Sequence, residues 1–144
     1  TFGAHPVSMA AIVANIKLMI KEKIPERAAK MGKYLGEKLR ELEDRHKCVG
    51  LVNGCGLYWI VEIVKNKKTK EPFIKEDRNA AYAGDISSYP SEIVSRKGLE
   101  KGVIIGGFVP NTLRIGPALN ITEDEINIGI EALDYALTEI DKMC

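Results

Sequence analysis

The sequence predicts an α+β fold, with a small and mostly antiparallel sheet of three strands packed by four helices. In four segments apolar residues recur at steps of three and four, which is typical of helices that bury one face. In three short segments β-branched and other apolar residues alternate or cluster between turn residues, as in strands. The 144 residues are 45% hydrophobic and 28% charged, which suits one ordinary domain with a buried core.

The composition argues against several classes of function. A net charge of +1 gives no strong field to attract nucleic acid, and the basic run 65–70 has no interleaved aromatic residues. No apolar run approaches the roughly 20 residues of a membrane helix, and no segment resembles a signal peptide. The three cysteines contain no CxxC pair, so neither a disulfide framework nor a zinc site is indicated. We therefore expect a cytoplasmic protein that binds neither nucleic acid nor membranes.

Two helices are expected first. Pro6 suits the first turn of a helix that runs to Lys23 and is apolar on nearly every side at its start. Pro25 ends this helix, and a second helix follows that should lie on the sheet. Its repeating apolar residues are Ala28, Met31, Leu35, Leu39 and Leu42. The chain begins at Thr1 rather than at a methionine, so we expect either a fragment or a processed chain.

The first strand is expected at 57–64, where alternate residues are apolar after a glycine-rich bend. The segment 65–89 is polar and lacks a clear period, which favours a functional or interface loop. Pro90 opens a third helix, and Gly102 supplies its left-handed stop. The residues of this helix expected to face inward are Ile93, Val94 and Leu99.

Two short strands are expected at 103–105 and 112–115, joined across the segment 106–111. The last helix begins with a capping box formed by Thr122 and Glu125. Its repeating apolar face consists of Ile126, Ile130, Leu133, Leu137 and Ile140.

Arg114 is the first candidate for a binding residue. Leu113 and Ile115 flank it, and alternate side chains of a strand point to opposite faces, so Arg114 should point away from the core. A guanidinium held there can bind a carboxylate with two parallel hydrogen bonds. The alternative is an ordinary strand arginine in contact with solvent.

Thr1, Phe2 and Gly3 form a second candidate site because they precede the first helix. A hydroxyl and backbone N–H groups meet there at the end of a helix dipole that favours an anion, which indicates a phosphate site. The alternatives are a simple helix entry and a catalytic Thr1 that uses its own amine as base.

Three further residues are weaker candidates. His5 precedes Pro6 and is either a helix-entry residue or a base. Glu62 is the one acid on its expected strand, which indicates a partnered charge or an edge position. Cys55 lies between two glycines and is a candidate thiolate, although no histidine is near it in sequence. The basic run 65–70 is expected to be the solvated end of a hairpin.

Three motifs resemble those of a known family. Residues 1–8, TFGAHPVS, resemble the T-[FY]-x-x-H-P segment of class III aminotransferases, and residues 112–122, TLRIGPALNIT, resemble their L-R-x-x-P-P-L-x-I-T segment. Between them, residues 54–62 resemble the family's G-x-G-L-x-x-x-x-E segment. The motifs stand in the family's order and cover nearly the whole chain. The chain therefore resembles the C-terminal part of a class III, ornithine or ω-amino acid type, aminotransferase dependent on pyridoxal phosphate.

The resemblance implies roles for the candidate residues. Thr1 and Phe2 would contact the phosphate of pyridoxal 5'-phosphate held mainly by the other subunit of a homodimer. Arg114 would bind the carboxylate of an amino acid or a 2-oxo acid. The segments 61–89 and 106–111 look more like the taurine and ω-amino acid aminotransferases that use pyruvate. No lysine here stands in the context of the family's Schiff-base lysine, so the chain alone is expected to be inactive.

The resemblance also implies a domain organisation. As part of a fold-type I enzyme, residues 1–24 would be the end of the large domain and the interdomain helix, and residues 25–144 the C-terminal small domain. A different interpretation is a stand-alone α+β module that binds a small carboxylate or a protein partner without catalysis. The segment 7–14 distinguishes the two interpretations. In the enzyme it would be covered by other parts of the protein, whereas in a stand-alone module it would be buried within these 144 residues.

Overall fold

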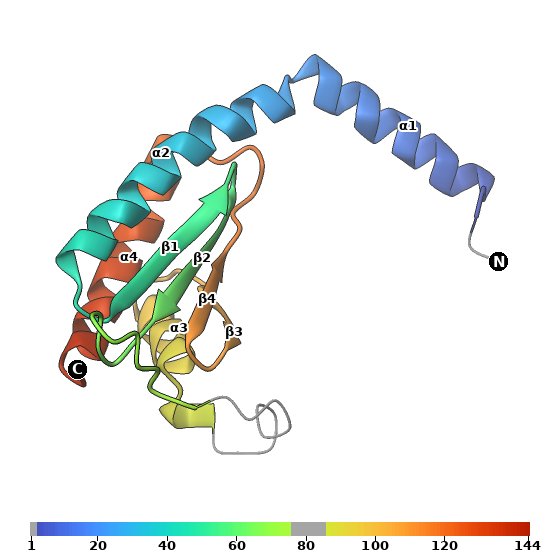
Figure 1. Ribbon diagram of the computed structural model, residues 1–144. Helices are drawn as coiled ribbons and strands as arrows, with labels where there is room; N and C mark the ends of the chain where they lie inside the picture. Colours follow the sequence, from blue (N-terminus) through green and yellow to red (C-terminus); the bar gives the residue numbers. More distant parts are fainter. Residues whose placement is uncertain (1–2, 76–85) are drawn as a thin grey trace.

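The computed structural model describes residues 3–75 and 86–144. In chain order, the elements are α1 (Pro6–Lys21), α2 (Ile24–Arg45), β1 (Val49–Cys55), β2 (Tyr58–Ile63), the 3₁₀ helix η1 (Ile86–Ser88), α3 (Pro90–Glu100), β3 (Gly106–Val109), β4 (Thr112–Ile115) and α4 (Glu123–Asp141) (Figure 1). The expected α+β class is confirmed. Of the described helices, none is both long enough and apolar enough to cross a membrane.

The four strands form one antiparallel sheet in the order β1-β2-β4-β3. The helices α2, α3 and α4 pack against one face of it, and the core lies between them and the sheet. Among the largest fully buried side chains are Leu39, Leu42, Val61, Ile63, Val94, Leu113, Leu137 and Ile140. The expected inward faces of the second and last helices are therefore confirmed. The prediction that Leu99 of α3 faces inward is wrong, because its side chain is 59% exposed.

The prediction of three strands is wrong, because the part of the chain that the structure describes contains four. The strand missed from the sequence is β1, which pairs with β2 along its whole length. Its sequence, VGLVNGC, includes two glycines and an asparagine, which are depleted in strands and hide the alternation.

The expected strand at 103–105 is also wrong, because β3 begins only at Gly106. The neighbouring helix α3 accounts for the shift. The Val103 amide donates to the Gly98 carbonyl at the end of α3, at 2.9 Å. The Ser95 hydroxyl donates to the Ile105 carbonyl at 2.6 Å. The Val103 amide and the Ile105 carbonyl are therefore hydrogen-bonded to α3 and do not pair with a neighbouring strand.

A close approach between α2 and the β1–β2 hairpin fixes the helix on the sheet. A Cβ atom built on Gly36 would lie 2.3 Å from the Trp59 ring, and one on Gly32 would lie 2.1 Å from the Gly56 carbonyl oxygen. Only glycine allows this packing. The Trp59 indole N–H donates to that same Gly56 carbonyl at 2.8 Å, so the buried ring has a partner.

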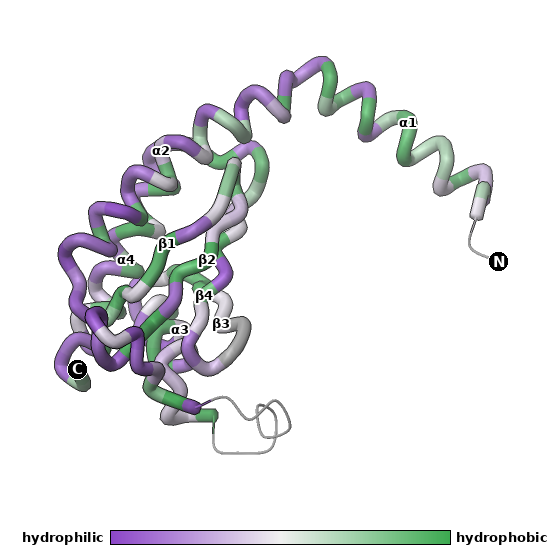
Figure 2. The backbone as a smooth tube through the Cα atoms, viewed as in Figure 1, coloured by the Kyte–Doolittle hydropathy of each residue, from purple (hydrophilic) through white to green (hydrophobic). Residues whose placement is uncertain are grey.

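Helix α1 stands apart from the rest of the molecule (Figure 1). Lys23, with a φ of 50°, forms a left-handed joint between α1 and α2. No residue of α1 is buried, although the helix is largely apolar, as the green colouring of Figure 2 shows. Its exposed large apolar residues are Val7, Met9, Ile12, Val13, Ile16, Leu18 and Ile20.

The segment 65–75 is tied to the sheet. Asn111, buried in the turn between β3 and β4, donates from Nδ2 to the Ile74 carbonyl at 2.7 Å and accepts from the Ile74 amide at 3.1 Å. Lys67 and Lys70 donate to the backbone carbonyls of Glu43 and Gly50. The basic run 65–70 is therefore not purely a solvated hairpin end, because two of its lysines are hydrogen-bonded to backbone carbonyl oxygens. Residues 76–85 of the expected loop lie outside the described residues.

Candidate functional site

Arg114 lies on the face of the sheet that carries no helix. Its neighbour Leu113 is fully buried towards the helices, so strand alternation places Arg114 on the exposed face, as the sequence predicted. The register sets Ile60 of β2 on one side of it and Gly106 of β3 on the other. The guanidinium is therefore carried by a strand that is paired on both sides, which is a rigid support for a binding group.

A cavity of about 370 Å³ adjoins Arg114. The cavity is formed by α2, the segment before β3, the end of β4 and the first half of α4. The residues that line it are Leu35, Leu39, Val103, Ile104, Ile105, Gly106, Arg114, Ile115, Gly116, Pro117, Ile121, Glu125, Ile126, Gly129, Ile130 and Leu133. Among these described lining residues, only Arg114 and Glu125 carry a charge. An apolar cavity with few polar groups at its edge is the usual form of a small-molecule site.

The Glu125 carboxylate is already engaged in the capping box of α4, which confirms that prediction. It accepts from the Thr122 amide and from the Thr122 hydroxyl, each at 2.8 Å. The bond from the Thr122 amide, with that from the hydroxyl, holds the pKa of Glu125 below its usual value. Glu125 is therefore engaged at the start of α4, and Arg114 is the candidate for binding an anion, on the face of the sheet that carries no helix.

Thr1 and Phe2 of the second candidate site lie outside the described residues. The part that is described runs from Gly3 into the first turn of α1, where Pro6 occupies the first helical position. That turn holds no acidic residue, and the first amides of a helix have no partner within it. This exposed helix start fits a phosphate group. It does not lie near Arg114 within the chain, because α1 projects away from the sheet (Figure 1).

The weaker candidates are not brought together. His5 precedes α1, is exposed and makes no side-chain capping bond. Glu62 is half-buried on β2 and pairs across the sheet with Leu51 and Thr112. Cys55 is exposed at the end of β1 and is a free thiol.

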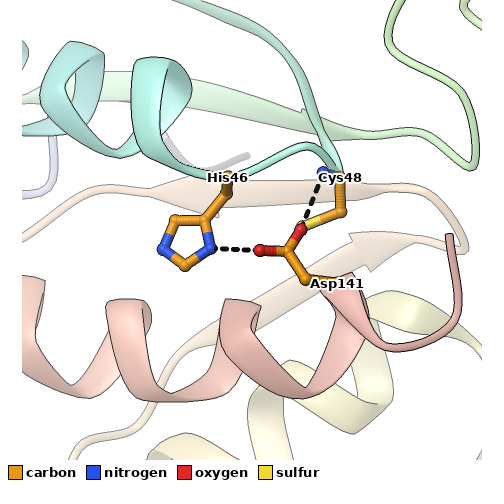
Figure 3. A group of neighbouring side chains, drawn as sticks. All are labelled: His46, Cys48 and Asp141. Atoms are coloured by element: carbon orange, nitrogen blue, oxygen red, sulfur yellow. Dashed lines mark hydrogen bonds and ion pairs between the residues drawn. The ribbon is translucent and has the colours of Figure 1, made fainter.

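The sequence analysis missed a cluster around His46 at the end of α2 (Figure 3). The His46 ring lies between two carboxylates of α4, with Nδ1 2.7 Å from Asp141 and Nε2 2.8 Å from Asp134. Asp141 also accepts from the Cys48 amide at 2.9 Å. The one available signal was the spacing of seven between Asp134 and Asp141, which puts both on one helix face.

This cluster is a brace between α2, β1 and α4 rather than a reactive site. Ligand atoms of His46, Cys48 and Asp141 lie within 4.8 Å of one another, close enough for a metal ion. However, the His46 and Asp141 atoms already bond to each other, and burial raises the pKa of the Cys48 thiol well above its usual value. The thiol therefore stays protonated, unlike a metal-binding or catalytic cysteine.

The comparison with known families decides the identity. The model of the family "Aminotransferase class-III" matches residues 1–137. This chain belongs to the class-III aminotransferases. Members of the family depend on pyridoxal phosphate.

Relatives of this class-III chain support the assignment. It is 35% identical over 142 residues to alanine–glyoxylate aminotransferase 2 homolog 2, mitochondrial, from Arabidopsis thaliana, covering 97% of this chain and 27% of that protein. It is 33% identical over 148 residues to the taurine–pyruvate aminotransferase of Bilophila wadsworthia, covering 99% and 30%. The crystal structure of an S-selective transaminase from Bacillus megaterium superposes with a TM-score of 0.90 and 45% identity, over 96% of this chain and 29% of that one. The chain thus spans less than a third of the length of these class-III relatives.

Proposed function

We propose that this chain is the C-terminal part of a pyridoxal-phosphate-dependent aminotransferase, called here the complete enzyme. The complete enzyme moves an amino group between an ω-amino acid or a taurine-like donor and a 2-oxo acid such as pyruvate. The observation that carries the proposal is Arg114, held by a strand paired on both sides, in a chain matched by the class-III family model along 137 residues.

The residues of this chain bind and orient rather than transfer protons. Arg114 grips the carboxylate of the amino or 2-oxo acid, which fixes the distance of the reacting carbon from the cofactor. Thr1 and Phe2 would hold the phosphate of the cofactor. When bound, pyridoxal phosphate supplies the electron sink for the reaction. The Schiff-base lysine belongs to a part of the complete enzyme outside this chain, which alone is therefore inactive.

The proposed domain organisation follows from the position of α1. Residues 1–24 form the end of the large domain and the interdomain helix, and residues 25–144 form the small domain of a fold-type I enzyme. The left-handed joint at Lys23 and the separation of α1 from the sheet support this division. We assign the complete enzyme to the cytoplasm and to a homodimer with shared active sites, in which the apolar surface of α1 is covered.

The alternative is a stand-alone module that binds a carboxylate without catalysis. Such a module would have to bury the apolar segment 7–14 within its own 144 residues. In the structure Val7 is 72% exposed, and no residue of α1 is buried. This exposure favours the enzyme over the module, since monomeric proteins rarely leave a large apolar surface in water.

The donor is tested with the purified complete enzyme and pyruvate as acceptor. Alanine formation is measured with taurine, β-alanine, ornithine or acetylornithine as the donor. We expect activity with taurine or β-alanine. Activity confined to ornithine and acetylornithine would overturn the donor assignment and leave the aminotransferase itself in place.

A further inference from the structure

The connection between β4 and α4, residues 116–121, is hydrogen-bonded to α2 through Arg27. From its place near the start of α2, Arg27 donates from Nη2 to the Asn120 carbonyl at 2.7 Å and to the Ile121 carbonyl at 3.2 Å. Figure 1 shows this connection rising from β4 and passing beside α2 before α4 begins. The two bonds therefore join parts of the fold that are 93 and 94 residues apart in the chain.

The two carbonyl groups lie just outside the hydrogen-bond ladder of α4. Thr122 is the N-cap of that helix, and its carbonyl accepts the first helical bond, from the Ile126 amide at 3.0 Å. The Asn120 and Ile121 carbonyls precede the N-cap, so a partner for them has to come from elsewhere. Arg27 provides a charged donor, whose hydrogen bonds are stronger than those between neutral groups. It thereby fixes the end of the connection.

The same connection begins one residue after Arg114. Arg114 is paired with Ile60 of β2 and with Gly106 of β3. The ladder with β3 ends at Arg114, and only the ladder with β2 continues to the next pair, Ile115 with Trp59. The chain thus leaves the sheet directly beyond Arg114, and the course of β4 at this point depends on what holds the residues that follow.

We propose that Arg27 is a positioning residue of the complete enzyme. By binding the Asn120 and Ile121 carbonyls, it holds the far end of the connection and so fixes the end of β4 from which the Arg114 side chain extends. Arg27 itself touches neither substrate nor cofactor. The inference rests on the proposed function, because it assumes that Arg114 binds the substrate carboxylate. A misplacement of about 1 Å at such a binding group can slow a reaction by up to about 100-fold.

The test is a double-mutant cycle between Arg27 and Arg114 in the complete enzyme. The enzyme is loaded with the aminated form of its cofactor, and the second-order rate constant for alanine formation from pyruvate is measured. Arg27→Gln should lower this constant about three- to tenfold when Arg114 is present, and no more than about twofold in the Arg114→Ala background. A residue that acts through Arg114 loses its effect once the guanidinium is gone, whereas a general loss of structure lowers both constants equally.

Two further variants serve as controls. Arg27→Lys keeps the charge but not the planar fork of donors, so its rate constant should fall between those of Arg27→Gln and the native enzyme. Lys30→Gln removes a charge from the same stretch of α2. The Lys30 ammonium lies 3.9 Å from the Glu123 carboxylate, and both side chains are more than half exposed. Such an ion pair contributes little, so this variant should stay within about twofold of the native enzyme.

Circular dichroism and cofactor absorbance show that each variant is folded and loaded, and Arg27→Lys takes the place of Arg27→Gln in the cycle if the glutamine variant does not fold. Three results would each overturn the role of Arg27 and leave the proposed function in place. These are an unchanged rate constant in Arg27→Gln, an equal loss in both backgrounds, and a loss in Lys30→Gln as large as that in Arg27→Gln.

Arg114→Ala separates the two levels of the proposal. If the native enzyme forms no alanine, or if Arg114→Ala leaves the rate constant unchanged, the proposed function or its carboxylate site fails and the inference about Arg27 fails with it. If Arg114→Ala lowers the constant but Arg27→Gln does not, only the inference about Arg27 fails.

Discussion

Arg114 and His46 show at the residue scale what a single sequence can and cannot reveal. Arg114 is flanked by Leu113 and Ile115, and this local pattern was enough to place it on the face of the sheet opposite the core. His46 meets Asp134 and Asp141 across 88 and 95 residues, and no local pattern reports such a pairing. The contact depends on α2 and α4 lying side by side in the fold.

Arg114→Ala in the complete enzyme should lower kcat/KM for carboxylate substrates by about 10- to 100-fold. A lost charge-assisted hydrogen bond is worth roughly 1.5–3 kcal/mol, and this loss should appear without a change in cofactor binding. Steady-state kinetics and cofactor absorbance measure the two effects. Arg114→Lys, which keeps the charge but not the fork of donors, should fall between the alanine variant and the native enzyme. An unchanged kcat/KM in Arg114→Ala would remove the assignment.

The brace at His46 should contribute to stability through Asp141. Asp141→Asn replaces a carboxylate that accepts from both His46 and Cys48, so we expect a loss of about 1–3 kcal/mol in the local stability of α2 and α4. Hydrogen–deuterium exchange of peptides spanning 40–52 and 134–144 measures this loss. Glu131→Gln, an exposed acid on the same helix, is the control and should leave exchange unchanged.

The same residue gives a pH dependence. Burial tends to raise the pKa of Asp141, but hydrogen bonds from Cys48 and His46 outweigh it and hold the pKa below its ordinary value. Because the folded pKa is lowered, the stabilisation is fully present above the ordinary carboxyl pKa of about 4 and is lost as the pH falls below it. The difference in unfolding free energy between native and Asp141→Asn chains should therefore shrink between about pH 5 and pH 3. Urea denaturation across that range would contradict the account if the difference stayed constant.

At the scale of elements, helices were easier to predict than strands. Proline starts, the Gly102 stop and the capping box of α4 are local signals, and the helices begin or end within a few residues of them. The strands depend on partners. β1 is paired despite its glycines because β2 is available beside it, whereas 103–105 is apolar but unpaired because α3 binds its backbone groups. Single-sequence patterns contain neither fact.

Two glycine-to-alanine changes should have opposite effects on helix stability. Gly32→Ala on α2 would push a methyl group into the Gly56 backbone and should cost about 1–3 kcal/mol, in spite of the better helix propensity of alanine. Gly129→Ala on α4 meets nothing within 4 Å and should stabilise by up to about 1 kcal/mol. Urea denaturation followed by circular dichroism compares the two variants. A stabilised Gly32→Ala would show that α2 does not lie this close to the hairpin.

At the scale of the whole molecule, the sheet and its three helices form a core, while α1 extends from it with its apolar residues uncovered (Figures 1 and 2). Every α1 residue that the sequence expected to be covered is exposed within this chain. This exposure agrees with the proposal that α1 is an interdomain helix covered by other parts of a dimeric enzyme.

The isolated 144-residue chain should therefore bind an apolar dye and self-associate, and residues 25–144 should do neither. Removing 1–24 deletes the exposed apolar helix but leaves the core residues in place. Dye fluorescence and sedimentation velocity report the two properties. A monodisperse 144-residue monomer that binds no dye would instead mean that α1 folds back on the core.

The most direct measurement of the central claim is the amino-group half-reaction of the complete enzyme. The protein loaded with pyridoxal phosphate is mixed with alanine in the absence of any acceptor, and the pyruvate released is quantified. An aminotransferase should release about one pyruvate per bound cofactor and then stop, because each cofactor takes up one amino group. A fully loaded protein that forms no oxo product from any of three donors, namely no pyruvate from alanine, no sulfoacetaldehyde from taurine and no 3-oxopropanoate from β-alanine, would contradict the assignment of aminotransferase activity.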